Sequence, residues 1–570
     1  MKYFNWGFIF CTLSLAFIVA CKNEGIVDTS SIATDSLSIA QGKRLFTQQC
    51  AACHSFSQEG IGPPLGGLTK EVNTGWIKSF ILNPKKIIDA GDKRGQQLMA
   101  RYKSYMIPFP GLDNQSLDQI VAYMHTEDKP VFASGSDTLP VLANPYPDTI
   151  PMSDLVVGLK YITQFPASDT NKFLRTRITK LGFEPSSKNL FVLDLRGKLY
   201  RLKNDQPVVY LDMPASRPKF IHTPGLATGF GSFAFHPEFS KNGLLYTTHT
   251  EPANTAKADF GYADSIPVAL QWVLTEWTTK NPGEIKFTGT GRELVRINVE
   301  SVIHGVQEID FNPRSNPGDE DYGLLYIGVG DGGSVEHGYP QLAHNLHTVW
   351  GNVLRIDPRG NNAANGQYGI PATNPFVDEK ENGALGEIYA RGFRNPHRIT
   401  WTKAGQMLVS NIGHANIESL NLILPGHDYG WPITEGPFMI DIKGNMKNIF
   451  ARPAAYDQYN ITYPVAAFDH DEGLAITGGY EYTGTQVPSL EDKFLFGDIP
   501  KGRLFYVNTS DISLGRIAPI KEWQVSVDGK LKTLKELCGN DRVDLHFGKD
   551  AAGEIYILTK PDGKVYKLID

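Results

Sequence analysis

Residues 309–333 read "IDFNPRSNPGDEDYGLLYIGVGDGG", in which a short apolar strand, a Gly- and Pro-bearing turn and a second apolar strand follow one another. The same order recurs at 190–202, 233–249, 399–413, 493–508 and 545–568. A hairpin of this kind cannot bury both faces of its sheet alone, and radial repetition of such units solves that problem. The repeats therefore predict an all-β, six-bladed propeller over residues 153–570, with its excess length in long loops at 251–300 and 435–470.

The composition agrees with a multidomain globular chain. The 570 residues are 41% hydrophobic and 20% charged, with 56 glycines and 36 prolines, which suits a body rich in turns. The formal net charge is -6, whereas nucleic-acid-binding domains are typically basic, so we expect no nucleic-acid partner. The five cysteines fall in separate settings and indicate no disulfide framework.

The N-terminus has the features of an export signal. Residues 1–20 carry one lysine ahead of an apolar run that is short for a membrane span. The "IVAC" that ends at Cys21 resembles a bacterial lipoprotein cleavage box, which implies lipid on the Cys21 thiol and a place in the bacterial cell envelope, periplasmic or on the outer membrane surface. An ordinary signal peptide or an uncleaved anchor is the alternative. Polar residues 21–35 predict a flexible tether, and Pro-rich residues 129–152 predict a linker.

Between tether and linker, residues 36–128 predict a small all-α unit that binds haem. The stretch "CAACH" at 50–54 is the spacing of c-type haem attachment. Cys50 and Cys53 reach the two vinyl groups of one haem, and the His54 imidazole falls over the iron as an axial ligand. A redox dithiol would not need the histidine, and a zinc site would need a second ligand pair nearby.

The surroundings of this motif resemble a class I cytochrome c. The resemblance lies in "GKRLFTQQCAACHSFSQEGIGPPLGGL" and "YMIPFPGLDNQSLDQIVAYM", the second of which predicts a helix with Ser116 as its N-cap. It implies that Met106, just before the Pro-Phe turn, is the sixth iron ligand. Met99 is the rival, but it lies too far from that turn. Methionine ligation raises the haem potential, which suits an electron acceptor.

The repeats resemble the glucose/sorbosone dehydrogenase family. The motifs that carry this resemblance are "GSFAFHPEFSKNGLLYTTH", "LLYIGVGDGG", "HTVWGNVLRIDPRGNN", "RGFRNPHRITW", "GHANIESLNLILPGHDYGWP" and "ITGGYEYTG". The family's members are six-bladed propellers that hold pyrroloquinoline quinone (PQQ) and calcium over the axis. The resemblance implies a membrane-anchored dehydrogenase that oxidises a sugar or polyol, with electrons passing to the haem and on to a cytochrome or terminal oxidase.

The resemblance also assigns a reaction centre. His304 matches the general base that takes the substrate's hydroxyl proton, and Asp331 of "GDGG" matches the carboxylate that orients it. A carboxylate on one ring nitrogen fixes the tautomer and leaves the other nitrogen free as the base. Arg394 and Asn395 match the pair that contacts the quinone, for which a forked guanidinium is suited.

Further cofactor ligands follow from the same resemblance. The backbone carbonyls of Gly413 and His414 match the calcium ligands, and Glu418 is a candidate third donor. Lys501 and Arg542 match cations that hold the quinone's carboxylates. Lys501, however, is offset by one position, and Arg542 stands alone where the family has a pair.

Other departures leave a second function open. Ala227 stands where the family has a substrate-binding side chain, and "HGVQEID" replaces the usual Gly-Gly pair after His304. The hedgehog-interacting proteins resemble the same scaffold without the enzyme activity, and "ITGGYEYTG" is similar to that branch. The alternative is therefore a glycan- or protein-binding propeller fused to an electron-transfer cytochrome c.

Overall fold

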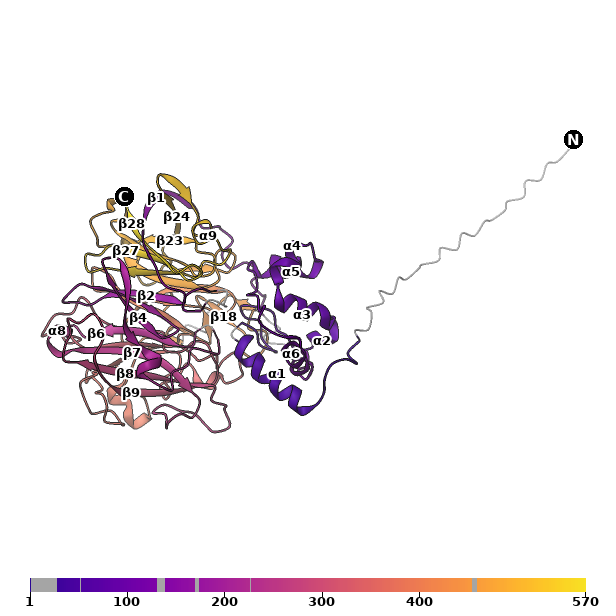
Figure 1. Cartoon of the computed structure of the whole chain (residues 1–570), viewed down its shortest axis with the longest axis horizontal. Helices are drawn as coiled ribbons and strands as arrows, with labels where there is room; N and C mark the ends of the chain where they lie inside the picture. Colours follow the sequence, from indigo (N-terminus) through magenta and orange to yellow (C-terminus); the bar gives the residue numbers. More distant parts are fainter. Residues whose placement is uncertain (2–27, 52, 131–138, 170–173, 226, 454–458) are drawn as a thin grey trace.

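The computed structural model describes residues 1, 28–51, 53–130, 139–169, 174–225, 227–453 and 459–570 (Figure 1). Helices α1–α6 gather on one side of a large β-rich body, next to strand β18. The predicted signal peptide, Cys21 and the first part of the tether lie outside the described residues. In the part of the chain that is described, no helix is long and apolar enough to cross a membrane.

The N-terminal part is all-helical, as expected. Its helices are α1 Ser36–Gln49, α2 Leu68–Glu71, α3 Thr74–Leu82, α4 Pro84–Asp89, α5 Lys93–Tyr102 and α6 Asn114–His125. Helix α6 packs on α1 at Gly42, where an added Cβ would lie 1.8 Å from Gln119 O, so only glycine allows this approach. The expected N-cap Ser116 is wrong: α6 begins two residues earlier, since the Asp113 carboxylate accepts from Ser116 N at 2.8 Å.

Over the described residues the C-terminal part forms six four-stranded antiparallel blades, of which three are separate sheets and the other three are joined into one larger sheet by the parallel pairs β1–β24 and β2–β26. The first two blades are β2 Ile178–Phe183, β3 Leu190–Asp194, β4 Lys198–Lys203 and β5 Gln206–Asp212, then β6 Phe230–Phe235, β7 Leu244–Pro252, β8 Leu270–Thr279 and β9 Gly289–Val299. The next two are β10 Glu308–Phe311, β11 Leu325–Val329, β12 Asn352–Ile356 and β13 Ile388–Arg391, then β14 Pro396–Trp401, β15 Met407–Asn411, β16 Ile417–Ile423 and β20 Ala466–Asp469. The last two are β21 Ile476–Glu481, β22 Lys493–Asp498, β23 Leu504–Asn508 and β24 Lys521–Val527, then β26 Leu545–Lys549, β27 Ile555–Thr559, β28 Lys564–Ile569 and β1 Met152–Gln164.

These sheets close into a ring. Contacts join β26 to β2, β3 to β6, β6 to β10, β10 to β14, β14 to β21 and β21 to β26. Strand β1 completes the sixth blade by pairing antiparallel with β28, and its first half also pairs parallel with β24 of the fifth. The first strands of the blades thus surround the axis, and the loops that precede them meet at one face. The predicted cytochrome c and propeller folds are both confirmed.

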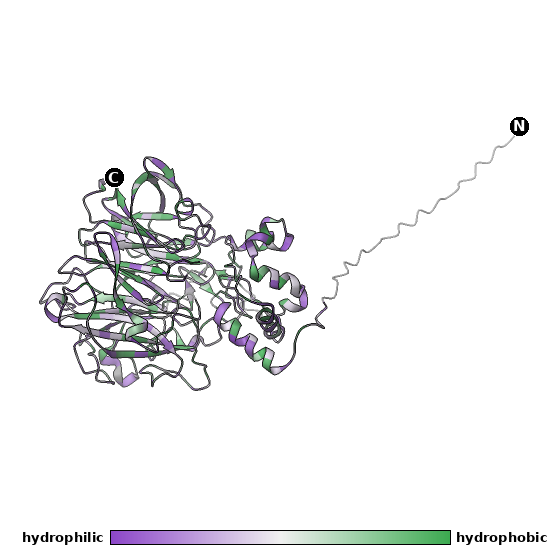
Figure 2. Ribbon diagram, in the orientation of Figure 1, coloured by the Kyte–Doolittle hydropathy of each residue, from purple (hydrophilic) through white to green (hydrophobic). Residues whose placement is uncertain are grey.

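The expected single long loop at 251–300 is wrong, because β8 and β9 lie within it and pair over ten residues each; loops remain at 253–269 and 280–288. Residues 435–470 do form an excursion, which holds a small sheet of β17 Thr434–Glu435, β18 Phe438–Ile440 and β19 Ile449–Phe450. Short elements complete the chain: α7 Met213–Ser216, α8 Phe239–Asn242, β25 Lys530–Lys532 and α9 Leu534–Cys538. Hydrophobic residues colour the strands throughout the blades in Figure 2, as expected for cores between stacked sheets.

Candidate functional site

A cavity of about 690 Å³ opens beside the haem-attachment motif. Cys50, Cys53, His54 and Met106 all line it, so the residues predicted to bind haem meet around one space. Met99 lines the same cavity, and the choice between the two methionines therefore stays a prediction. Burial raises the pKa of the Cys50 thiol to about 12, which keeps it protonated before attachment.

His54 is oriented for iron ligation. Its Nδ1 lies 2.9 Å from the Pro63 carbonyl oxygen. Since a carbonyl only accepts, Nδ1 carries the proton and Nε2 keeps its lone pair for a metal. Burial lowers the pKa of His54, which favours the neutral ligand form. A Cβ on Gly62 would lie 2.3 Å from the His54 ring, so the close loop requires glycine there.

The cavity also fits the acidic groups of a haem. Trp76 Nε1 is buried and has no hydrogen-bond partner among the described residues, and Arg94 lies 5.7 Å from the Trp76 ring. Both side chains line the cavity. An unpaired indole N–H donor next to a guanidinium group can bind a carboxylate, and haem carries two propionate groups.

The propeller supplies the other wall of this cavity. Arg177, His222 and Arg542 line it from segments that precede β2, β6 and β26, and Arg196 lines it from the turn between β3 and β4. Burial raises the pKa of Cys53, and the charge of Arg542 acts against that rise. Cys53, one of the two thiols predicted to attach haem, therefore lines the same cavity as the propeller residue Arg542.

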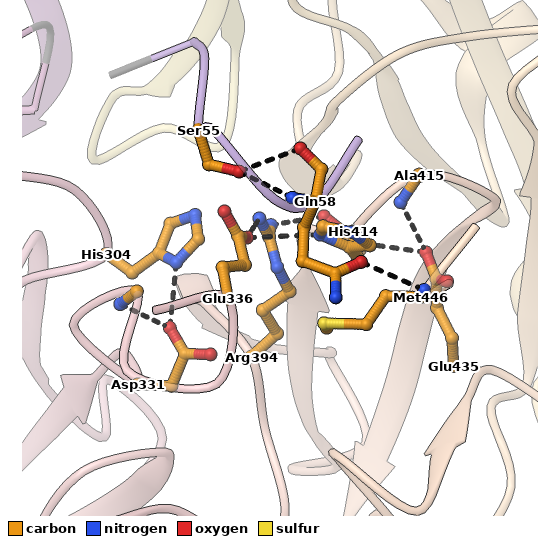
Figure 3. Close-up of polar contacts among 12 residues, drawn as sticks. Ser55, Gln58, His304, Asp331, Glu336, Arg394, His414, Ala415, Glu435 and Met446 are labelled. Atoms are coloured by element: carbon orange, nitrogen blue, oxygen red, sulfur yellow. Dashed lines mark hydrogen bonds and ion pairs between the residues drawn. The ribbon is translucent and has the colours of Figure 1, made fainter. Parts of the chain in front are cut away.

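Direct bonds hold the two parts together. Gln58 Nε2 donates to Gly444 O at 3.0 Å, and Met446 N donates to Gln58 Oε1 at 3.1 Å (Figure 3). Lys447 Nζ lies 2.9 Å from Glu59 Oε1, a buried carboxylate. The segment after "CAACH" is thus docked on the excursion of the fourth blade.

His304 and Asp331 form a pair at the face of the propeller that the cytochrome covers. His304 Nδ1 lies 2.8 Å from Asp331 Oδ1 (Figure 3). Gly333 N and Trp431 Nε1 donate to the same carboxylate at 2.8 and 2.9 Å. His304 has a left-handed φ of 50°, a strained conformation of the kind found at functional sites. Burial and then the charge of Arg394 lower the pKa of His304, so its ring is neutral near pH 7.

Arg394, two residues before β14, belongs to the same cluster as His304 and Asp331. Its guanidinium donates to the Gly413 carbonyl and pairs with Glu336, whose Oε1 is also 3.1 Å from His414 Nδ1. Burial opposes ionisation of Glu336, but Arg394 and His414 hold its pKa well below the usual value. Sequence reasoning missed Glu336, although it stands five residues after Asp331 in the same motif.

The candidate calcium carbonyls lie in a turn fixed by two carboxylates. Glu435 Oε1 accepts from four successive backbone N–H groups, 414 to 417, at 2.6 to 3.1 Å. Glu418 accepts from Gly413 N at 3.2 Å and from Ile476 N at 2.7 Å. Because its oxygens are engaged in this way, Glu418 positions the Gly413 carbonyl and does not point outward as a ligand.

The remaining predicted residues are dispersed. Lys501 Nζ donates to the carbonyls of Asp471 and Glu472 at 3.4 and 3.3 Å. Arg542 pairs with Asp544 at 2.8 Å and lines the haem cavity. Asn395 is buried beside Arg394, with its backbone bonded to residues 411 and 412.

Comparisons with known proteins agree with this arrangement. The family model for "Glucose / Sorbosone dehydrogenase" matches residues 180–567, and that for "Cytochrome c" matches residues 39–128. The human Hedgehog-interacting protein is 26% identical over 417 residues, 70% of this chain and 51% of its own length. Quinoprotein glucose dehydrogenase B of Acinetobacter calcoaceticus is 26% identical over 322 residues, 51% of this chain and 58% of its own.

The fold comparison points the same way. A crystal structure of a glucose dehydrogenase superposes with a TM-score of 0.50 at 16% identity, covering 72% of this chain and 98% of that one. The chain spans about half the length of the curated relatives it matches. With two thirds of its length matched by one family model and a haem-binding unit ahead of it, the chain belongs to the glucose/sorbosone dehydrogenase family and carries an N-terminal cytochrome c domain.

Proposed function

We propose that the chain is a membrane-anchored quinohaemoprotein dehydrogenase that oxidises a sugar or polyol in its propeller and delivers the electrons to its own haem c. The observation that carries the proposal is the shared cavity, which Cys53 and His54 line from one domain and His222 and Arg542 from the other. A haem held by these residues would lie in a cavity that the propeller also lines, so no diffusing acceptor would be needed for the first transfer.

The described residues fit both implied groups. When bound, PQQ supplies a two-electron acceptor and haem a one-electron carrier. Arg394 and Asn395 would hold the quinone, and Arg394 Nε is buried without a partner among the described residues. The carbonyl of His414 offers an oxygen donor of the kind that calcium prefers, and the Gly413 carbonyl would join it once Arg394, from which it now accepts, turned to the quinone.

His304 is the proton acceptor of this proposal. Its Nδ1 is tied to Asp331, so the neutral ring presents the lone pair of Nε2 to a substrate hydroxyl. Asp331 stabilises the imidazolium that forms, and Trp431 and Gly333 hold that carboxylate in place. Burial of His304 and Asp331 keeps bulk water from replacing these bonds.

Anchoring through Cys21 belongs to the same proposal, with the protein in the periplasm or on the outer membrane surface and a cytochrome or terminal oxidase as the downstream partner. A Cys21→Ser variant should leave the membrane fraction and lose palmitate labelling. Labelling that persists in this variant would show that lipid is attached elsewhere.

Reconstitution tests the enzymatic part. Haem-loaded protein, freed of quinone and metal, receives PQQ and Ca²⁺ and is then mixed with a panel of aldoses and polyols while the haem band is followed. We expect haem reduction only with quinone, calcium and one class of substrate together. Failure to bind quinone in the presence of calcium would favour the glycan- or protein-binding propeller instead.

A further inference from the structure

Three polar side chains on the propeller axis carry atoms without a hydrogen-bond partner in the described part of the chain, although His546 Nδ1 lies 3.5 Å from Thr477 Oγ1. They are Thr179, His397 and His546, each the second residue of the first strand of its blade, β2, β14 and β26. Thr179 Oγ1, both ring nitrogens of His397 and Nε2 of His546 have no hydrogen-bond partner among the described residues. Buried polar atoms are nearly always paired, so this group indicates a ligand.

The imidazole rings of His397 and His546 lie side by side. Their ring centroids lie 5.7 Å apart, and the residues are only 5% and 1% exposed. Burial, followed by the charges of Arg398 and Lys560, holds the pKa of both His397 and His546 well below 6.5. Both rings are therefore neutral near pH 7, and each has an N–H to donate.

Lys560 lies close enough to both rings for its charge to act on them, and that charge has no ion-pair partner among the described residues. Its backbone carbonyl accepts from Thr176 Oγ1 at 2.9 Å, which joins the end of β27 to the segment before β2. No hydrogen bond or ion pair of its ammonium is found in the described part of the chain. Burial lowers the pKa of Lys560 to about 8; Asp544 opposes this shift, and Arg177 and Arg542 add to it.

Neighbouring charges do not neutralise Lys560. Arg398 is engaged with Glu308 at 3.3 Å, and Arg542 is engaged with Asp544 at 2.8 Å. Each nearby carboxylate thus already has a cationic partner. The local excess of positive charge disfavours a metal ion and favours an anion.

We infer that Lys560, His397 and His546 form a carboxylate-binding site on the propeller axis. His397 follows Arg394 of the reaction centre by three residues, and His546 follows Arg542 of the haem cavity by four, so the site adjoins both. The ligand class is an aromatic polycarboxylate. The identification of that ligand with the quinone rests on the proposed function.

This site takes over the role that the sequence suggested for Lys501. That ammonium is engaged with two backbone carbonyls, whereas the ammonium of Lys560 has no such bonds. In the fold the two lysines follow different strands, β22 and β27, of different blades. A polycarboxylate held by Lys560 would lie over His397 and His546, with their N–H groups as further donors.

Calorimetry on the haem-loaded full-length chain, with PQQ and Ca²⁺ as the probe, tests the site. Lys560→Gln should weaken binding about 10- to 100-fold, the range for a lost charge-assisted hydrogen bond, and Lys560→Arg should restore most of it. Lys549→Gln is the matched control: burial lowers the pKa of Lys549 to about 8 as well, but it lies at the opposite end of β26 and donates to Glu481 O at 3.2 Å. It should change the affinity less than twofold.

The pH dependence gives a second readout. Above pH 8 the Lys560 ammonium loses its proton in the free protein, so wild-type affinity should fall up to about tenfold per pH unit, with proton uptake on binding. Asp544, Arg398, Arg542 and Arg177 also face this lysine, and burial and the charge of Arg196 lower the pKa of Arg177 to about 10. The Lys560→Gln variant should show no such slope between pH 7 and 9.

Benzene-1,2,4-tricarboxylate as a second probe separates this inference from the proposed function. If the wild type binds the tricarboxylate in a Lys560-dependent way but not the quinone, the site stands and the dehydrogenase proposal fails. If the quinone binds wild type and Lys560→Gln equally and without the pH slope, the inference is wrong and the dehydrogenase proposal stands. Binding of neither probe overturns the inference.

Discussion

Replacing Asp331 by Asn should separate the chemistry of this site from its stability. Both carboxylate oxygens accept: Oδ1 from His304 and Gly333 at 2.8 Å each, and Oδ2 from Trp431 at 2.9 Å. An amide has one accepting oxygen and one donating NH₂ group. With its NH₂ group at the Oδ2 position the amide meets the Trp431 N–H and loses one bond, and at the Oδ1 position it meets the N–H groups of His304 and Gly333 and loses two.

The size of each effect can be worked out from these bonds. One unpaired buried donor costs about 1–3 kcal/mol of folding free energy. The lost negative charge no longer stabilises the imidazolium of His304, and loss of such general-base support lowers kcat by about 10²–10⁴. Because Asp331 raises the pKa of His304 against burial, the acid limb of the rate profile should also move to lower pH in the variant.

The assay is stopped-flow reduction of haem by substrate at saturating quinone and calcium, over pH 5 to 8. Asp498→Asn is the control, since Asp498 is a fully buried carboxylate that accepts from Leu474 N and Lys501 N and has no histidine partner. It should lose similar stability and keep its kcat within about threefold, as expected for a residue that touches no reacting atom. If Asp331→Asn keeps both its kcat and its pH profile, the assignment of His304 as base is refuted.

Three further predictions concern the rest of the molecule. Met106→Ala should lower the haem potential in a redox titration and abolish the near-infrared methionine band, whereas Met99→Ala should do neither; the opposite pattern would exchange the ligands. Glu59→Gln leaves the cations around it without a counter-charge, so the domains should separate more readily, seen as a larger radius of gyration in X-ray scattering; an unchanged radius would mean that the other contacts suffice. The free energy of unfolding should fall as pH drops below 6.5, since burial depresses the pKa of His397 and His546 and the unfolded chain binds protons that the native protein excludes. Urea unfolding of His546→Phe between pH 5 and 7 should show a smaller slope, and an equal slope would assign the effect elsewhere.

Features encoded in short contiguous stretches could be predicted from the sequence. The spacing of "CAACH" already contains both thiols and the ligand, and the structure only adds that Pro63 fixes the His54 tautomer. Each of the six recurring hairpins lies in a separate blade, because strand pairing across a short turn is local. The segment 251–300 failed for the converse reason: nine residues, 280–288, separate its two long strands, so their pairing is less local and is visible only in the sheet.

Contacts that depend on ring closure could not be predicted. Glu336 reaches Arg394 and His414 only because the loops of the third and fourth blades meet at the axis. Lys560 and His397 are far apart in the chain, and nothing in the residues around either indicates a shared ligand. Their relation follows from burial and from missing partners, which are properties of the assembled propeller.

The central claim is that one chain both oxidises the substrate and receives its electrons. The most direct measurement is the rate of haem reduction by substrate in fully reconstituted protein, followed over a hundredfold dilution of the protein. Transfer within the chain predicts a rate constant that does not change with protein concentration. A rate that falls in proportion to dilution would mean that electrons pass between molecules, and it would contradict the role given to the shared cavity.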